Sequence, residues 1–170
     1  MIELILGGAR SGKSSLAEER ARATGKPVTV IATATAGDAE MKARIARHQA
    51  DRDSAWQVIE EPFRLGKVLE EQSGKGHCLL VDCLTLWLTN CLCADSEDKW
   101  VEEKIHLLET LTRLSDEDII LVSNEVGHGI VPLGQLSRQF VDESGWLHQA
   151  IAKKADSVSF VMAGLPLKLK

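Results

Sequence analysis

Hydrophobic positions along the chain follow two alternating patterns. Short continuous runs are rich in Val, Ile and Leu, a composition typical of strands that are buried on both faces. The longer stretches between them carry apolar residues at the spacing of a helix with one buried side. Strands that alternate with helices in this way predict an α/β fold, in which helices cover both faces of a mostly parallel central sheet.

The same pattern gives approximate bounds for each element. The expected strands are 3–6, 28–32, 56–59, 78–82, 119–123 and 157–162, with a further candidate at 165–169. The expected helices lie near 13–24, 38–52, 63–72, 84–91, 97–114 and 133–154. No repeat or low-complexity tract divides the chain, and its 44% hydrophobic content suffices for one full core, so residues 1–170 are expected to form a single domain.

Charge narrows the class of ligand. A net charge of −5 argues against a nucleic-acid binder, whereas the basic patch of Lys42, Arg44, Arg47 and Arg52 suits a small anionic ligand. The N-terminal MIELILGG has only a short apolar run and no basic flank, which predicts neither a signal peptide nor a membrane span. We therefore expect a cytoplasmic protein that acts on small molecules.

The four cysteines, Cys78, Cys83, Cys91 and Cys93, lie in the apolar sequence CLLVDCLTLWLTNCLC. A zinc site is one interpretation, but no CxxC pair is present. The apolar surroundings favour the other interpretation, in which the cysteines are reduced thiols that face the core.

The clearest motif follows the first expected strand. The sequence ELILGGARSGKSS fits the pattern G-x-x-x-x-G-K-[ST] between a strand and a helix. Glycines let the backbone wrap closely around a phosphate, and the N–H groups of the loop and helix N-terminus supply positive charge. Lys13 is expected to reach the β and γ oxygens, and the Ser14 hydroxyl to bind Mg²⁺. The predicted phosphate-binding residues are Gly7, Gly8, Ala9, Arg10, Ser11, Gly12, Lys13 and Ser14.

Two further strand ends carry polar side chains. A phosphate loop needs an acidic group on a neighbouring strand to hold Mg²⁺ through water, and Asp82, at the end of CLLVD, is the candidate. Its carboxylate could instead, or also, cap the helix that follows. Asn124 and Glu125 follow another buried strand, where loops line the ligand crevice of an open α/β sheet. They either contact substrate or the attacking hydroxyl, or belong to a structural turn.

The stretch MKARIARHQADR places a histidine among basic residues. On a helix, Met41, Ile45, His48 and Arg52 share one face, and Arg44 lies one turn before His48. A histidine in such a position is commonly a half-buried packing residue. Alternatively, the arginines on either side of the imidazole bind a polyphosphate, since guanidinium groups bind phosphate oxygens in a bidentate way. The residue pattern by itself leaves both interpretations open.

Four segments together resemble one enzyme family. GGARSGKS, IATATAGDAEMKARIARHQADR, LLVDCLTLWLTN and NEVGHGIVP are similar, in this order, to bifunctional adenosylcobinamide kinase/adenosylcobinamide-phosphate guanylyltransferases. The resemblance covers nearly the whole chain and implies a RecA-like P-loop NTPase domain. It also implies two reactions. The aminopropanol hydroxyl of adenosylcobinamide is phosphorylated with ATP or GTP, and GMP from GTP is then transferred to that phosphate with release of pyrophosphate.

The resemblance also assigns roles to individual residues. The histidine that carries GMP in the family matches His48, so His48 and Lys13 are the predicted catalytic residues, with Mg²⁺ at Ser14 and Asp82. Matches to further nucleotide contacts are Ala32, Thr33, Ala34, Gln49, Ala50, Asp51, Arg52, Glu60 and Asp82. Some members have a second histidine where this chain has Arg47. His128 replaces a small or apolar residue, and no role is assigned to it.

The expected position of His48 raises a geometric question. The helix 38–52 begins at the ligand edge of the sheet, yet His48 lies about 15 Å along its axis. We therefore expect a mobile helix with a hinge at 33–38. Helices of a neighbouring subunit would help to close the site, which favours a homo-oligomer. The rival functions are a simple small-molecule kinase without a covalent intermediate and a RecA-like motor, which the acidic charge and short length disfavour.

Overall fold

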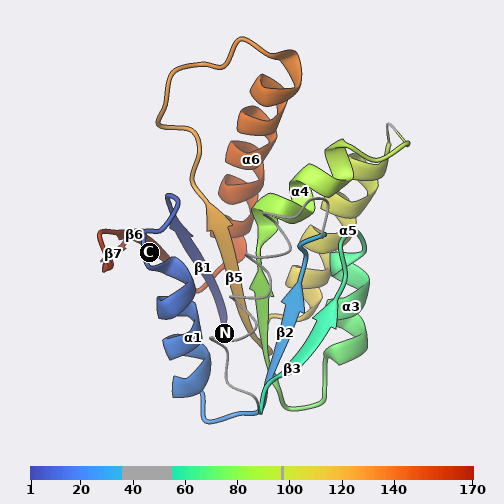
Figure 1. The fold of residues 1–170 in the computed structure, drawn as a ribbon. Coiled ribbons are helices and arrows are strands. Elements are labelled where there is room, and N and C mark those ends of the chain that lie inside the picture. Colours follow the sequence, from blue (N-terminus) through green and yellow to red (C-terminus); the bar gives the residue numbers. More distant parts are fainter. Residues whose placement is uncertain (36–54, 97) are drawn as a thin grey trace.

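The computed structural model describes residues 1–35, 55–96 and 98–170. These residues form a layered α/β fold in which helices cover both faces of one central sheet (Figure 1). The expected fold class is therefore confirmed. The expected helix 38–52, which contains His48, lies outside the described residues.

The sheet has seven strands, and each expected strand is present. Their spatial order is β3 (Gln57–Glu60), β2 (Val28–Ala32), β4 (Cys78–Asp82), β5 (Asp118–Asn124), β1 (Ile2–Gly7), β6 (Ser157–Met162) and β7 (Leu165–Lys168). Neighbouring strands are parallel except for β7, which pairs with β6 in the antiparallel direction. The strand that precedes the glycine loop thus lies between β5 and β6, inside the sheet.

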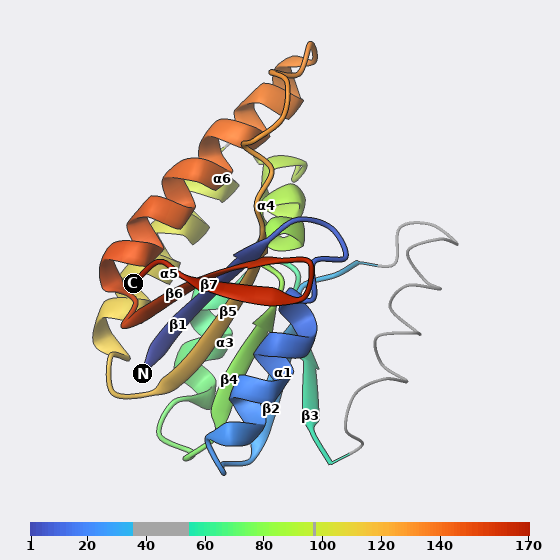
Figure 2. The same ribbon diagram turned by 90° about the vertical axis from the view of Figure 1, so that its left-hand side faces the viewer.

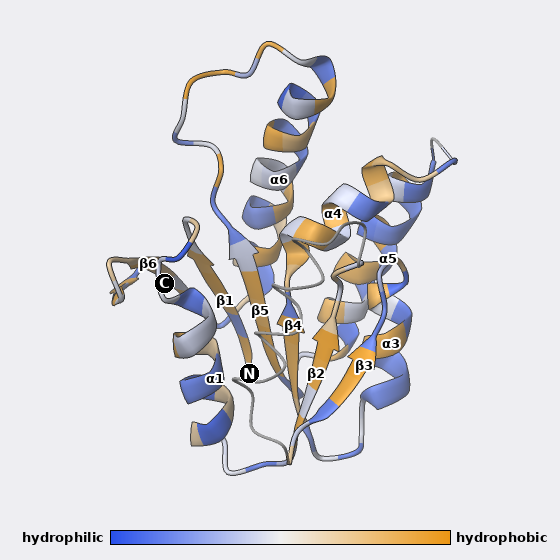
Figure 3. Ribbon diagram, viewed as in Figure 1, coloured by the Kyte–Doolittle hydropathy of each residue, from blue (hydrophilic) through white to orange (hydrophobic). Residues whose placement is uncertain are grey.

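Helices divide unequally between the two faces. The helix α1 (Lys13–Ala23) covers one face, and the other face is covered by α3 (Leu65–Gln72), α4 (Leu84–Leu92), α5 (Lys99–Arg113) and α6 (Gln135–Lys154) (Figure 2). Figure 3 shows why helices pack on both faces of the sheet. The central strands are hydrophobic over most of their length, whereas the helices carry both hydrophobic and hydrophilic residues. Each helix can therefore bury one side against the sheet and expose the other.

Two buried clusters show which way the strand residues point. On β5, Ile119 and Leu121 pack with α3, α4, α5 and α6, whereas Ile120 and Val122 pack with α1. The same alternation places Leu79 and Val81 of β4 in the first cluster and Leu80 in the second. Successive side chains of a strand point to opposite faces. The last residue of each strand can therefore be assigned to a face by counting.

Helix starts differ slightly from the expected bounds. The helix expected from residue 63 begins at Leu65, because the Glu61 carboxylate accepts hydrogen bonds from the backbone N–H groups of Phe63 and Arg64, at 2.9 and 2.8 Å. Such a side-chain turn offers the backbone an alternative to helical hydrogen bonds. The helices expected from 97 and 133 begin at Lys99 and Gln135.

The expectation for the cysteines is right for three of the four. Cys78, Cys83 and Cys91 are buried, whereas Cys93, at the C-terminal cap of α4, is exposed, so the expectation that it faces the core is wrong. Burial raises the pKa of Cys78 to about 11 and that of Cys91 to about 12. Within the described residues no cluster of metal-ligating side chains is found, and no helix is both long and apolar enough to cross a membrane.

Trp87 is the largest fully buried side chain of the core and joins α4 to two neighbouring elements. Its indole N–H donates to the Phe63 carbonyl at 2.6 Å, and its ring packs edge-to-face on Trp100 with centroids 5.3 Å apart. We expect Trp87→Ala to lower the free energy of unfolding by about 3–5 kcal/mol, because it removes both contacts and leaves a cavity. Chemical denaturation followed by circular dichroism measures the loss.

The control for this prediction is Trp146→Ala, since Trp146 is exposed on α6. Its effect should stay within about 0.5 kcal/mol, as for most surface substitutions. Equal effects of the two substitutions would contradict the role of Trp87 in the core.

Candidate active site

The phosphate loop joins β1 to α1 and packs tightly against its surroundings. A Cβ atom on Gly7 would lie 2.5 Å from Ser11 Oγ and 2.6 Å from the Val161 carbonyl oxygen, closer than real contacts allow. Gly12, the N-cap of α1, has φ of 96°, a conformation that side chains other than glycine rarely adopt. Gly7 is thus required because neighbouring atoms leave no room for a side chain, and Gly12 is required because of its backbone conformation.

Lys13 and the helix terminus supply the positive charge of the loop. The Lys13 side chain is buried, and its Nζ donates to the Gly8 carbonyl at 3.1 Å, so the ammonium group lies over the loop. The first turn of α1 contains no acidic residue that would oppose an anion. Ser11 Oγ is buried and has no hydrogen-bond partner within the described part of the chain. The loop therefore has the charge and the backbone geometry of a phosphate site.

A turn that the sequence analysis missed supports this loop from the side. In the turn between β6 and β7, the Gly164 N–H donates to the Ser11 carbonyl at 2.8 Å. The Cα atom of Gly164 would lie 3.1 Å from a Cβ on Gly12. Two glycines far apart in the sequence thus let the turn and the loop touch. Local sequence carries no signal for this contact, because it depends on how strands β1 and β6 pair.

Three predicted nucleotide-binding residues form a row at the carboxyl edge of the sheet. Ala32 is paired with Glu60 of β3 on one side and with Asp82 of β4 on the other. Counting along the strands places all three side chains on the α1 face, the face of the phosphate loop. Asp82 and Gly7 end strands two positions apart in the sheet, a lateral separation of about 10 Å.

The alternative role of Asp82 as a helix cap is not realised. The N-cap of α4 is Cys83, and no side chain caps that helix. The prediction that Ser14 and Asp82 hold Mg²⁺ is compatible with the structure, because a hydroxyl and a carboxylate are oxygen ligands of the kind that this ion prefers. Both side chains are half-buried and belong to the same face.

Thr33 is fixed in the protein interior. Its hydroxyl donates to the Cys83 carbonyl at 2.6 Å and accepts from the Cys83 N–H at 2.9 Å. Its own carbonyl accepts from the Asn90 amide at 2.8 Å. The Thr33 N–H donates to the Asp82 carbonyl at 3.2 Å, so the first residue of the expected hinge 33–38 is held by β4 and α4 through its side chain and its backbone.

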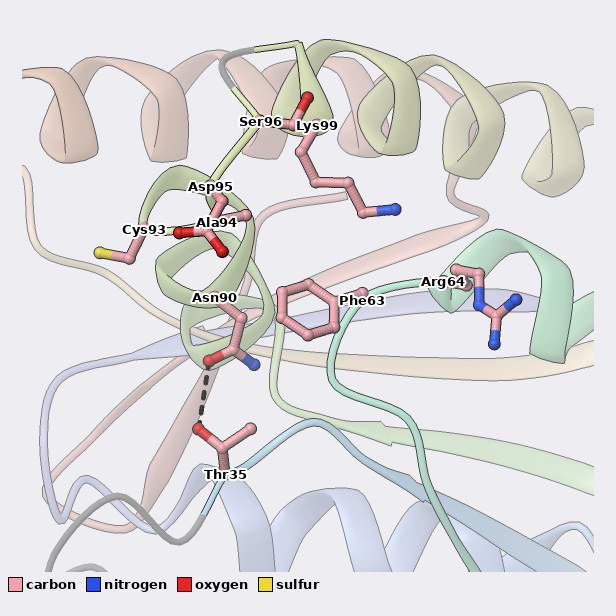
Figure 4. Close-up of a pocket in the computed structure, with 9 residues that line it drawn as sticks. All are labelled: Thr35, Phe63, Arg64, Asn90, Cys93, Ala94, Asp95, Ser96 and Lys99. Carbon is pink, nitrogen blue, oxygen red and sulfur yellow. Dashed lines mark hydrogen bonds between the residues drawn. The ribbon is translucent and has the colours of Figure 1, made fainter.

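A cavity opens beside Asn90, the residue that holds the Thr33 carbonyl (Figure 4). It measures about 590 Å³, and its lining residues are Thr35, Phe63, Arg64, Asn90, Cys93, Ala94, Asp95, Ser96 and Lys99. The Thr35 hydroxyl donates to the Asn90 side-chain oxygen at 3.4 Å, and Lys99 Nζ lies 6.0 Å from the Phe63 ring centroid. The carboxyl edge of the sheet therefore offers a cavity in addition to the phosphate loop.

The polar residues at the carboxyl end of β5 belong to two different faces. Asn124 lies on the α1 face by the alternation of β5, whereas the Glu125 carboxylate is directed to α6. There His148 Nδ1 lies 3.4 Å from Glu125 Oε2, and His148 Nε2 lies 2.8 Å from Ser123 Oγ. Burial lowers the pKa of His148 more than the Glu125 carboxylate raises it. Sequence analysis found Asn124 and Glu125 but missed His148, which looks like an ordinary helix residue.

The remaining predicted residues are distributed as follows. His128 stacks on Phe160, with ring centroids 6.0 Å apart. Ala9 and Arg10 form the exposed part of the phosphate loop, Gly8 is half-buried, and Ala34 follows Thr33. The predicted contacts that lie outside the described residues are His48, Gln49, Ala50, Asp51 and Arg52.

The phosphate loop after β1, with an acidic strand end two strands away, defines a P-loop NTPase fold. The crystal structure of the RadB recombinase has a similar fold. It aligns with a TM-score of 0.50 over 94% of this chain and 73% of that chain, at 13% sequence identity. At this identity the likeness concerns the fold alone, and it supports the RecA-like class.

Sequence comparison assigns the chain to one family within that class. The model of the cobinamide kinase / cobinamide phosphate guanyltransferase family matches residues 3–169. Bifunctional adenosylcobalamin biosynthesis protein CobP of Pseudomonas aeruginosa is 56% identical over 170 residues, which cover 100% of this chain and 98% of the relative. The corresponding protein CobU of Salmonella typhimurium is 34% identical over 182 aligned positions, with both chains covered fully. The chain therefore belongs to this family of bifunctional enzymes, as the four quoted segments predicted.

The geometry of Gly12 gives a testable prediction. Gly12→Ala should lower the affinity for ATP and GTP more than tenfold, because the strained backbone and the close contact with Gly164 both displace the phosphate loop. Isothermal titration calorimetry measures this affinity.

Gly25→Ala is the matched control. Gly25 also has a positive φ, 66°, but nothing lies within 4 Å of an added Cβ, and it follows the far end of α1. The backbone strain should lower the stability of each variant by about 1–2 kcal/mol, while nucleotide affinity falls in Gly12→Ala alone. An unchanged affinity in Gly12→Ala would contradict the assigned role of this loop.

Proposed function

We propose that this protein phosphorylates the aminopropanol hydroxyl of adenosylcobinamide with ATP or GTP and then transfers GMP from GTP to the new phosphate. The second step proceeds through a guanylyl-histidine at His48 and yields adenosylcobinamide-GDP and pyrophosphate, in cobalamin biosynthesis in the cytoplasm. The observation that carries the proposal is the match of the family over residues 3–169 together with a complete phosphate loop.

The structure supports the kinase step through the placement of charge. Lys13 and the N-terminus of α1 would meet the β- and γ-phosphates of a nucleotide on this loop, where they would offset negative charge on the transferred group. Ser14 and Asp82 would hold Mg²⁺, which neutralises charge on the phosphates when bound. Lys13→Ala should impair phosphoryl transfer under any function that uses this loop, so other variants must test the substrate.

The guanylyl step rests on residues outside the described part of the chain. A histidine nucleophile at the α-phosphorus splits one difficult displacement into two easier ones. His48 has Arg44 and Arg52 about one helical turn away in the sequence pattern, where their charges would favour neutral imidazole and offset charge on departing pyrophosphate. Gln49, Ala50, Asp51 and Glu60 are the further proposed GTP contacts.

Labelling with GTP that carries ³²P at the α-phosphorus tests the covalent intermediate. The wild-type protein should retain label that is labile in acid and stable in alkali, as expected for a phosphoramidate, and His48→Ala should retain none. Phosphorylation of adenosylcobinamide should remain within about threefold of wild type in this variant, because the γ-phosphoryl transfer does not use the imidazole.

His128→Ala is the matched control, because His128 has no proposed role in either reaction. It should retain the label fully. Absence of label in the wild-type protein, with kinase activity intact, would indicate the alternative function, a simple small-molecule kinase. Equal loss of both activities in His48→Ala would contradict the division of labour.

We also propose that the enzyme acts as a homo-oligomer. The loop 125–134 projects beyond the carboxyl edge of the sheet (Figure 1), and its Ile130 and Leu133 are 97% and 98% exposed. Leu165, Leu167 and Leu169, which alternate along and just after the edge strand β7, are exposed as well. Apolar side chains gathered in this way are typical of surfaces that another subunit covers.

Light scattering coupled to size-exclusion chromatography tests this proposal. The wild-type protein should have a mass that is a multiple of the chain mass, and the double substitution Ile130→Asp with Leu133→Asp should reduce it to that of one chain. Ile105→Asp, on the exposed side of α5, is the control and should leave the mass unchanged. A monomeric wild-type protein would contradict the proposal.

A further inference from the structure

Asn124 occupies a distinctive place beside the phosphate loop. It is the last residue of β5, paired in register with Gly7 of β1, and Asp82 of β4 is paired with Val122 on the other side. Its side chain belongs to the α1 face, as does Asp82. The side-chain amide makes no hydrogen bond to another described residue. Asn124 therefore presents an amide group between the phosphate loop and the proposed Mg²⁺ ligand.

The backbone of Asn124 is held by polar side chains on the opposite face of the sheet. Its N–H donates to Thr85 Oγ1 on α4 at 2.7 Å, and Thr85 Oγ1 lies 3.3 Å from Ser123 Oγ. Ser123 Oγ in turn lies 2.8 Å from Nε2 of His148 on α6. Ser123 is 1% exposed and His148 is 7% exposed, so the contact between their side chains is shielded from water, whereas Thr85 is half-buried. Two helices thus fix the residue that carries the amide.

One arrangement of hydrogens is compatible with these contacts, although His148 Nδ1 makes no hydrogen bond to a described residue. A neutral His148 with its proton on Nδ1 directs an N–H toward Glu125 Oε2 and accepts from the Ser123 hydroxyl through Nε2. Ser123 then accepts from the Thr85 hydroxyl, and Thr85 accepts from the Asn124 N–H. Burial lowers the pKa of His148, which favours this neutral form. In this arrangement two hydroxyl groups link His148 to the backbone N–H of Asn124.

Glu125 ties the same network to the phosphate loop. Its backbone N–H donates to the Gly7 carbonyl at 3.1 Å, and its carboxylate accepts from the Gly127 N–H at 2.6 Å. His148 lies 3.4 Å from that carboxylate. The His148 imidazole thus contacts Ser123 and Glu125, the residues on both sides of Asn124. The backbone N–H of Glu125 is bonded to Gly7, the first glycine of the loop.

We propose that Asn124 is a catalytic residue of phosphoryl transfer and that His148 is a positioning residue that acts through it. The Asn124 amide donates a hydrogen bond to a non-bridging oxygen of the γ-phosphoryl group during transfer. His148 contacts that group only indirectly, through Ser123 and the end of β5. The assignment of adenosylcobinamide as the acceptor rests on the proposed function, but the role of Asn124 requires only a triphosphate on the loop.

The step is balanced as follows. The acceptor hydroxyl oxygen forms a bond to the γ-phosphorus while the bond from that phosphorus to the β–γ bridging oxygen breaks. The electron pair of the broken bond leaves with the nucleoside diphosphate, and the hydroxyl proton passes to solvent. Negative charge on the γ-phosphoryl oxygens is stabilised by a donor that is already in place, which costs no reorganisation during the reaction.

Asn124→Ala and Asn124→Asp test the catalytic role. Each should lower kcat for phosphoryl transfer by about 10²-fold or more, the usual effect of losing one preorganised donor. Asn124→Asp keeps the size of the side chain, yet it should be at least as impaired because its charge repels the phosphates. The KM for the nucleotide in Asn124→Ala and its melting temperature should change little. A kcat for either variant equal to that of wild type would overturn the proposal.

A double-mutant cycle tests whether His148 acts through Asn124. His148→Leu should lower kcat about tenfold in the wild-type background and have almost no further effect in Asn124→Ala, while KM stays unchanged in both. Equal effects in the two backgrounds would overturn the positioning role, as would a loss of thermal stability with unchanged kcat. If His148→Leu does not fold, Ser123→Ala, which removes the linking hydroxyl, takes its place in the same cycle.

Ser144→Ala is the matched control, because Ser144 is buried on α6 one turn before His148 and should leave kcat unchanged. The rates are measured with adenosylcobinamide as the acceptor and, separately, as basal ATP hydrolysis without acceptor. Basal hydrolysis that depends on Asn124 while adenosylcobinamide is not phosphorylated would refute the proposed function and support this inference. Phosphorylation of adenosylcobinamide that does not depend on Asn124 would support the proposed function and refute this inference.

Discussion

The parallel pairing of β1 with β5 is the constraint on which the candidate site depends. It places Gly7, where the phosphate loop begins, in register with Asn124, and β5 in turn pairs with the strand that ends at Asp82. Parallel strands deliver their carboxyl ends to one edge, and the alternation of side chains sends Asp82 and Asn124 to the face that α1 covers. The phosphate loop, the Asp82 carboxylate and the Asn124 amide come from distant parts of the sequence. The pairing of β1, β5 and β4 brings them to one edge of the sheet.

The opposite face of the sheet has a supporting function. Thr85, Ser123 and His148 lie there, separated from the phosphate loop by the sheet itself. Thr85 and His148 contact the end of β5, to which Ser123 belongs, and burial lowers the pKa of the His148 imidazole. Chemistry on one face of the sheet thus depends on polar packing on the other, and the strand transmits the constraint through its backbone.

Sequence predicted the parts of this protein that are specified locally. The elements and their type follow from the hydrophobic period, and the phosphate loop follows from a motif whose glycines have steric reasons at Gly7 and Gly12. Contacts that depend on strand order were beyond reach. His148 has no local pattern that distinguishes it from a packing residue, and Gly164 reaches the phosphate loop only because β6 lies beside β1. The exposure of Cys93 was mispredicted because an apolar sequence does not reveal where its helix ends.

The central position of β1 also bears on the order in which the chain can fold. Its neighbours, β5 and β6, begin at Asp118 and Ser157, so β1 leaves the ribosome long before its partners do. Such pairing has a high contact order and is intrinsically slow. Gly164 buttresses the nucleotide loop only after β6 and the turn that follows it have been synthesised. A nascent fragment without this turn therefore lacks one of the supports of the loop.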